Sequence, residues 1–214
     1  MPEAAVILQI PLHKIRFWTN GYSPTLSKGQ RAIVPNLKLL GSSRDRAFNF
    51  LTLIEMRVIM AFRESGISFH KVRQARQELI TMLGMNHPFA YRKLLYDKKK
   101  IYVVFDGPEK STIELGTRGQ AVFHDIISNF CKKIDFSNQS ELAERFWPLG
   151  RDKSIVVDPH HAFGHPVIHG TNIFPETIFN LHRAGETKDA IINLYDITET
   201  QYSDSIEFAG RKAA

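Results

Sequence analysis

The stretch PEAAVILQIPLHKIRFWTN, residues 2–20, predicts two short helices joined by a tight turn. Pro2 suits the first position of a helix, where its missing N–H costs nothing, whereas Pro11 disfavours helical geometry in the residue before it. Asn20 and Gly21 then supply a stop for the second helix. A helix, a tight turn and a second helix that carries basic residues are the plan of a helix-turn-helix.

A loop and two longer helices are predicted next. Residues 23–43 are rich in Ser, Pro and Gly, with a strand-like island RAIVP, and this composition indicates a loop or a wing beside the helices. Apolar residues at helical spacing predict helices over 47–65 and 69–83, with Ser68 as the cap of the second.

The middle of the chain predicts small β elements. Residues 96–118 are rich in β-branched and aromatic residues around a turn, which predicts a β-hairpin, and an amphipathic helix over 119–134 follows. The segment KIDFS, residues 133–137, predicts a further strand. Because Pro148 and Gly150 break the pattern after it, we expect a domain boundary near Gly150.

The last 64 residues predict a small helical domain, 151–214, after a first domain, 1–150. A short strand at 154–157 precedes three short helices, expected over residues 175–184, 187–194 and 200–209. Three short helices are again the size of a helix-turn-helix-like fold. The fold class that we expect is mainly α with small β elements (α+β): a winged helix-turn-helix-like domain with further helices and a β-hairpin, then a three-helix domain.

The charge is divided unevenly along the chain, which has a formal net charge of +6. Residues 1–100 hold 17 basic and 6 acidic side chains, whereas residues 101–214 hold 11 and 16. A polyanion such as nucleic acid suits the first half, because lysine and arginine displace its condensed counterions, and a basic protein suits the second. A merely solvated basic surface is the alternative.

The single cysteine and the acidic residue near the N-terminus bear on the cellular compartment in which the protein is expected. Cys131 has no partner cysteine, so neither a disulfide framework nor a thiolate metal cluster is expected. Glu3 stands where a signal peptide would need basic residues, and the apolar stretch 48–62 is interrupted by Glu55 and Arg57. We therefore expect a cytoplasmic protein without membrane contact.

Four histidines within ten residues raise the question of a metal site: His160, His161, His165 and His169, in DPHHAFGHPVIHGTNIF. Adjacent histidines in an extended segment point to opposite faces, and neither a cysteine nor an H-E-x-x-H motif accompanies them. Ordinary loop residues or partner contacts are favoured over metal ligands, and a metal-dependent hydrolase stays an alternative. The sequence also has no nucleophile elbow and no convincing phosphate-binding loop, so no enzyme and no cofactor are expected.

The C-terminal residues resemble a small domain that is widespread in bacterial antitoxins of the VapB class. Its pattern is D-P, then F-G-x-P-x-I-x-G-T, and later A-G, and this chain matches it at Asp158, Pro159, Phe163, Gly164, Pro166, Ile168, Gly170, Thr171, Ile173, Ala184 and Gly185. The match departs at Asn172, where the pattern usually has arginine. The N-terminal part resembles the DNA-binding half of the same antitoxins in KIRFWTNGY, FNFLTLIEMRVIMAFRESGISFHKVRQARQEL, HPFAYRKLLYD and GQAVF, and its arrangement is similar to MerR-type regulators.

This resemblance implies a type II antitoxin that binds its own operator DNA as a homodimer and represses it. The residues expected on DNA are His13, Lys14 and Arg16 on the second helix, Lys28 and Arg31 in the wing, and Arg44 and Arg46 before the long helix. Arg16 has the chemistry to pair bidentately with guanine. Trp18 is expected to pack against neighbouring helices rather than to stack on a sugar.

The resemblance also implies that the acidic domain covers a PIN-type ribonuclease toxin encoded by the adjacent gene. Candidate contacts are Phe174, Phe179, Tyr195, Glu199, Tyr202 and Phe208, about half of which must belong to the core. A MerR-like regulator without a toxin and an adaptor that binds only proteins stay open as alternatives.

Overall fold

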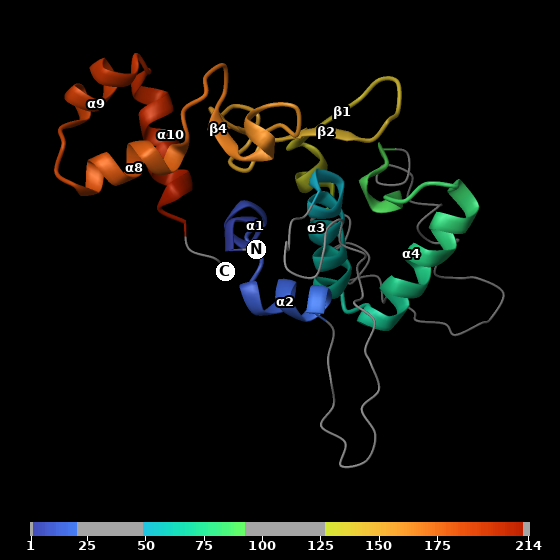
Figure 1. Ribbon diagram of the computed structural model, residues 1–214. Coiled ribbons are helices and arrows are strands. Elements are labelled where there is room, and N and C mark those ends of the chain that lie inside the picture. Colours follow the sequence, from blue (N-terminus) through green and yellow to red (C-terminus); the bar gives the residue numbers. More distant parts are fainter. Residues whose placement is uncertain (1, 21–48, 93–126, 212–214) are drawn as a thin grey trace, which may run out of the picture. The chain divides into compact units, whose positions relative to one another are not determined.

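The structure, a computed structural model, describes residues 2–20, 49–92 and 127–211, and these form an α+β protein as expected (Figure 1). Two compact units divide the described residues: 2–20 and 49–90 lie in the first, and 91–92 and 127–211 lie in the second. None of the described helices has the length and apolar character needed to cross a bilayer.

The first unit begins with the two helices that residues 2–20 predict, α1 (Pro2–Leu8) and α2 (Leu12–Asn20). The reversal between them turns at Gln9, which has a left-handed φ of 53°, and the N–H of Ile10 donates to the carbonyl of Ala5 at 3.1 Å. Ile10 is fully buried, so the turn itself is tied to the core.

Helix α3 (Phe50–Glu64) is the centre of the first unit, and α4 (Phe69–Leu83) follows it after a short turn. Asn49 caps α3 by accepting from the N–H of Thr52 at 2.7 Å, and Ser68 caps α4. Gly84 ends α4 with a left-handed φ of 64°, a geometry that glycine adopts without steric cost. A 3-10 turn, η1 (Pro88–Ala90), then packs on α3.

The carboxylate of Glu55 is buried inside this unit and fully surrounded by donors. Arg76 donates from Nε and Nη2 at 3.1 and 2.8 Å, Nδ1 of His87 lies 3.0 Å away, and the N–H of Phe89 donates at 3.3 Å. A buried charge is tolerated only when it is paired and hydrogen-bonded in this way. The network therefore locks α3, α4 and η1 together.

The second unit holds an antiparallel sheet in the order β1 (Ile134–Phe136), β2 (Ala143–Phe146), β3 (Ile155–Val157) and β4 (Pro166–Ile168). In the hairpin of β3 and β4, Ile155 faces Ile168 across the ladder, and all three β3 residues are buried. A 3-10 turn, η2 (Ala162–Gly164), lies in the connection of this hairpin.

The boundary predicted near Gly150 falls inside this sheet. Phe146 of β2 pairs with Val157 of β3, so residues on both sides of Gly150 belong to one unit. The assignment of a separate function to each part of the chain stays a prediction, and a fragment that begins at residue 151 would separate β2 from β3.

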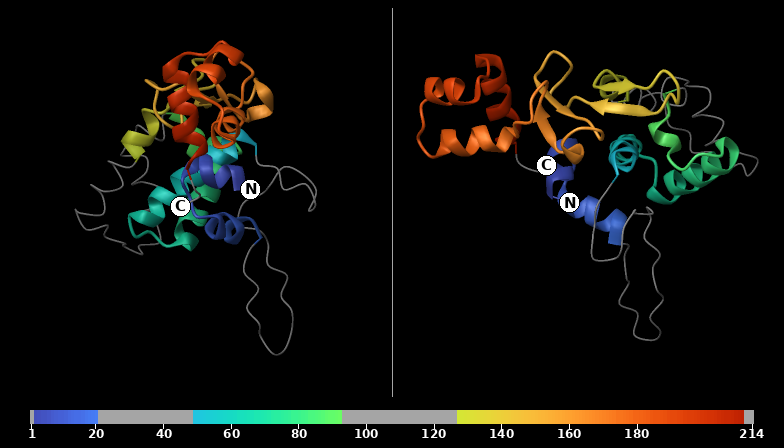
Figure 2. Two further views of the ribbon diagram at one scale, coloured as in Figure 1. Left: turned by 90° about the vertical axis from the view of Figure 1, so that its left-hand side faces the viewer. Right: turned by 45° about the horizontal axis from the view of Figure 1, so that its top comes forward.

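The three expected C-terminal helices are present as α8 (Pro175–Arg183), α9 (Lys188–Tyr195) and α10 (Glu199–Ala209). They gather beyond the β4 side of the sheet, away from β1, in the views of Figures 1 and 2. Thr198 begins α10 with a capping box that its partner Gln201 completes.

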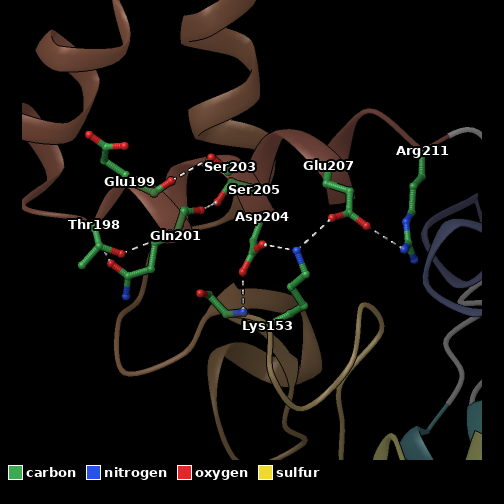
Figure 3. A network of polar contacts seen from close by, with 10 residues as sticks. Lys153, Thr198, Glu199, Gln201, Ser203, Asp204, Ser205, Glu207 and Arg211 are labelled. Atoms are coloured by element: carbon green, nitrogen blue, oxygen red, sulfur yellow. Dashed lines mark hydrogen bonds and ion pairs between the residues drawn. The ribbon is translucent and has the colours of Figure 1, made fainter.

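Asp204 of α10 joins these helices to the sheet (Figure 3). Its buried carboxylate accepts from the N–H of Ser154 at 2.8 Å and from the ammonium of Lys153 at 3.0 Å, just before β3 begins. The hydrogen bond and the charge of Asp204, together with Glu207, raise the pKa of Lys153 above its usual range. The start of β3 and the middle of α10 are thus held by the same carboxylate.

Several predicted elements lie outside the described residues. These are the loop or wing of residues 23–43, the hairpin of 96–118 and most of the helix over 119–134, of which residues 127–131 are described and are helical.

We predict that Arg76→Ala lowers the free energy of unfolding by about 3–5 kcal/mol, because it leaves the charge of Glu55 buried without its main partner. Urea unfolding followed by circular dichroism measures the change. The control is Arg57→Ala, which removes a half-buried arginine from a longer pair, 3.4 Å, with Glu64; because the Glu64 carboxylate is 35% exposed and stays hydrated, we expect a cost of less than about 1 kcal/mol. Equal costs for the two variants would contradict this account of the core.

Candidate functional site

Helix α2 has one face in the core and one face outside. Ile15 and Trp18 are 0% and 3% exposed, whereas His13, Arg16 and Phe17 are exposed. The packing role expected for Trp18 is therefore confirmed, and two of the three predicted contacts on α2 face outward. The third, Lys14, is half-buried with its Nζ 3.8 Å from Sδ of Met60, so it contacts α3 in this structure.

The amino-terminal turn of α4 lies beside α2 through aromatic contacts. The ring of Phe69 stacks on Trp18 at 6.1 Å with an interplanar angle of 10°, and it meets Phe17 edge-on at the same distance. His70 follows Phe69, and Arg73 lies one turn further on the same face of α4. Both are exposed, and no acidic residue occupies the first turn of this helix.

Exposed basic and aromatic side chains thus lie on α2 and on the start of α4, which contacts it through Phe69; we call them the α2–α4 surface and define it by His13, Arg16, Phe17, His70 and Arg73. The positive end of the α4 dipole adds to their charge, and such an arrangement favours an anionic partner. Sequence reasoning missed Phe17, His70 and Arg73 as candidates, because the contact of Phe69 with α2 joins residues about fifty positions apart and has no local signal in the sequence. Lys28, Arg31, Arg44 and Arg46 lie outside the described residues.

The six aromatic and acidic candidates of the second unit separate by burial. Phe174 is 42% exposed, Phe179 and Tyr195 are half-buried, and Glu199 is exposed. Tyr202 and Phe208 are 7% and 1% exposed, so their assignment to a partner surface is corrected: both are core residues of α10. The hydroxyl of Tyr202 is also engaged, 2.8 Å from Nδ1 of His182 on α8.

Glu199 at the start of α10 forms an ion pair with a lysine of α9. The ammonium of Lys188 donates to Oε2 of Glu199 at 2.8 Å, and both side chains are exposed to solvent. The hydrogen bond and the charge of Lys188 lower the pKa of Glu199, and the pKa of Lys188 is raised in turn by Glu199. A protein partner that binds this carboxylate must therefore compete with an existing, solvent-screened ion pair.

The rings of three of the four loop histidines make separate contacts. Nε2 of His161 lies 2.9 Å from the carbonyl oxygen of Thr171, the ring of His165 meets Phe174 edge-on at 6.0 Å, and the ring of His169 lies 5.1 Å from Trp147. Within residues 2–20, 49–92 and 127–211, no three His, Cys, Asp or Glu side chains are grouped to hold a metal ion. The geometry fits loop packing better than metal binding.

The same loop presents an aromatic side chain that sequence reasoning treated only as part of a pattern. Phe163 is 100% exposed, and it has a left-handed backbone with φ 55° and ψ 26°. Ala162 before it and Gly164 after it are also left-handed, with φ 47° and 77°. A left-handed φ is uncommon outside glycine, asparagine and aspartate, and spacing alone does not reveal it.

Cys131 is an unreactive core residue. Burial raises the pKa of its thiol to about 12, so the thiolate that would act as a nucleophile or metal ligand is not formed near neutral pH.

The comparisons with known proteins match both the whole chain and its last part. A family described as "Protein of unknown function (DUF433)" matches residues 155–209, from β3 to the end of α10. A protein of Mycobacterium tuberculosis named "Putative antitoxin VapB45" is 26% identical over 222 residues, which cover 97% of this chain and 91% of that protein. The crystal structure of Rv2018 from Mycobacterium tuberculosis shares the fold, with a TM-score of 0.67 and 21% identity over 95% of this chain and 94% of that one.

We predict that Glu199 titrates below the usual glutamate range and that Lys188→Ala returns its pKa to that range. The pair adds stability above the pKa of Glu199 in the unfolded chain and loses it as the pH falls through the lower folded value. A pH titration of the Glu199 side chain by NMR measures the shift. Lys132→Ala is the control that should leave it unchanged, and a normal pKa in the wild type would contradict the pair.

Proposed function

We propose that this chain is the antitoxin of a type II toxin–antitoxin pair, which acts by binding rather than by catalysis. Its first unit binds operator DNA in the cytoplasm as a homodimer, and its second unit neutralises a PIN-type ribonuclease toxin from the adjacent gene. The observation that carries this proposal is the similarity to VapB45, which extends over 97% of the chain and is not confined to one domain.

The α2–α4 surface supports the DNA-binding part of the proposal. Arg16 of α2 can donate two hydrogen bonds to guanine in the major groove, and the neighbouring ring of Phe17 can contact a thymine methyl group. His70 and Arg73 on α4 would hold the flanking phosphates, which set the register without reading the sequence. A dimer would place two such surfaces on the half-sites of a palindromic operator.

The charge of the second unit supports the toxin-binding part. Its described residues 127–211 include 12 acidic and 8 basic side chains, an acidic surplus that suits a protein with a basic RNA-binding groove. Glu199, Glu207 and Glu176 are exposed members of this set. Coverage of that groove would exclude RNA by steric and electrostatic means.

We predict that Arg16→Ala weakens operator binding by about 1–3 kcal/mol and relaxes the sequence preference at one base position of each half-site. Binding to promoter fragments, measured by fluorescence anisotropy at two salt concentrations, tests this. Arg183→Ala is the matched control, because it removes one arginine charge from the second unit. Equal affinities for wild type and Arg16→Ala would contradict the role of α2.

We predict that the purified chain abolishes RNA cleavage by the product of the adjacent reading frame when the two are present in equal amounts. Arg16→Ala should inhibit as well as the wild type, because its effect is confined to the first unit. A neighbouring protein that cleaves RNA equally with and without this chain would contradict the antitoxin assignment. DNA binding without inhibition would instead indicate a regulator of the MerR type.

A further inference from the structure

The side chain of Phe163 is not buried by the fold of its own unit. Its ring is fully exposed, and its left-handed φ of 55° follows a second non-glycine left-handed residue, Ala162. Both conformations cost free energy relative to glycine at the same positions, and no burial of the ring offsets that cost. Strained backbone that presents an exposed aromatic ring is typical of a binding loop rather than of a packing position.

The loop that carries Phe163 is nevertheless well ordered by hydrogen bonds. The N–H groups of Gly164 and His165 donate to the carbonyls of His161 and Ala162, each at 3.0 Å. Asp158 at the start of the loop accepts from Nε of Arg145 at 2.8 Å, and its other oxygen accepts from the N–H of His160 at 2.8 Å. A ring held on such a frame loses little conformational freedom when a partner binds it.

A second exposed aromatic side chain lies close to this loop. His165, two residues after Phe163, meets the ring of Phe174 edge-on at 6.0 Å, and Phe174 is 42% exposed. Nε2 of His161 contacts the carbonyl of Thr171, which ties the loop to the segment that leads to Phe174. Phe174 therefore lies beside the loop that carries Phe163.

We propose that Phe163 is the anchor of the protein-binding surface, and that its ring inserts into an apolar pocket of a basic protein partner. Buried aromatic anchors within a polar rim supply most of the free energy of many interfaces. The 12 acidic and 8 basic side chains of residues 127–211 favour a basic protein, and they disfavour nucleic acid or an anionic lipid surface, which an exposed ring could otherwise contact. This inference rests on the proposed function, in which that partner is the toxin.

The decisive variant is Phe163→Asn, because asparagine tolerates the left-handed backbone while the ring is removed. We expect its melting temperature to equal or exceed that of the wild type, since the ring is exposed in the free chain. Its dissociation rate from the purified product of the adjacent reading frame should rise at least tenfold in surface plasmon resonance, because loss of an anchor acts mainly on dissociation.

Two further variants separate the anchor from a general loss of apolar surface. Phe163→Trp keeps a large ring and should dissociate within about threefold of the wild type, because a large aromatic ring still fills the partner's pocket. Leu194→Asn is the matched control, because it makes the same apolar-to-asparagine change at a side chain of α9 that is 71% exposed, and its dissociation rate should stay at the wild-type value. Operator binding should be unchanged in all three variants.

The outcomes distinguish this inference from the proposed function. A wild-type complex that Phe163→Asn leaves at its original dissociation rate would overturn the anchor and leave the antitoxin proposal standing. A large fall in the melting temperature of Phe163→Asn would show a structural role for the ring and would also overturn it. A wild-type chain that binds no adjacent gene product would contradict the proposed function, and the anchor would be lost with it.

Discussion

The buried carboxylate of Asp204 makes the contacts on which the second unit depends. Strands β3 and β4 have only three residues each, and strands this short stay paired only when other elements pack against them. Asp204 fixes the start of β3 to α10 through Ser154 and Lys153, and the buried side chains of β3 complete the attachment. The loop of Phe163 connects the two strands of this hairpin. The buried carboxylate of Asp204 therefore helps to fix the position of the loop from another part of the unit.

In the first unit, a different set of contacts fixes the helices relative to one another. Glu55 and Arg76 hold α4 against α3, and Phe69 at the start of α4 packs on Trp18. Helix α2 is therefore positioned from its inner face, and His13, Arg16 and Phe17 on its other side are exposed. An exposed basic helix that is packed on its inner side is compatible with the sequence-specific DNA contacts that we propose.

Local signals in the sequence predicted the helices well. Ser68 and Gly84 are a cap and a stop, and α4 begins and ends between them, while Pro175 marks the first residue of α8. These residues act through their own backbone, so their effect can be read without knowledge of the rest of the chain.

Most of the features that were missed depend on contacts between distant residues, and one is an unusual local backbone conformation. The pairing of Phe146 with Val157 carries the sheet across Gly150, and no local pattern reveals pairing between strands this short. Tyr202 and Phe208 lie on the inner side of α10, where an amphipathic pattern alone does not separate core aromatic residues from surface ones. The left-handed backbone of Phe163 breaks the usual preference of its residue type, so only the structure shows it.

We propose that the first unit binds DNA and that the second unit binds a protein. Hydrogen–deuterium exchange of the full chain, alone, with its promoter DNA and with the adjacent gene product, tests it most directly. We expect DNA to protect α2 and the first turn of α4, and the protein partner to protect residues 158–174. Protection of the same unit by both ligands, or protection of the first unit by the protein partner alone, would contradict the account.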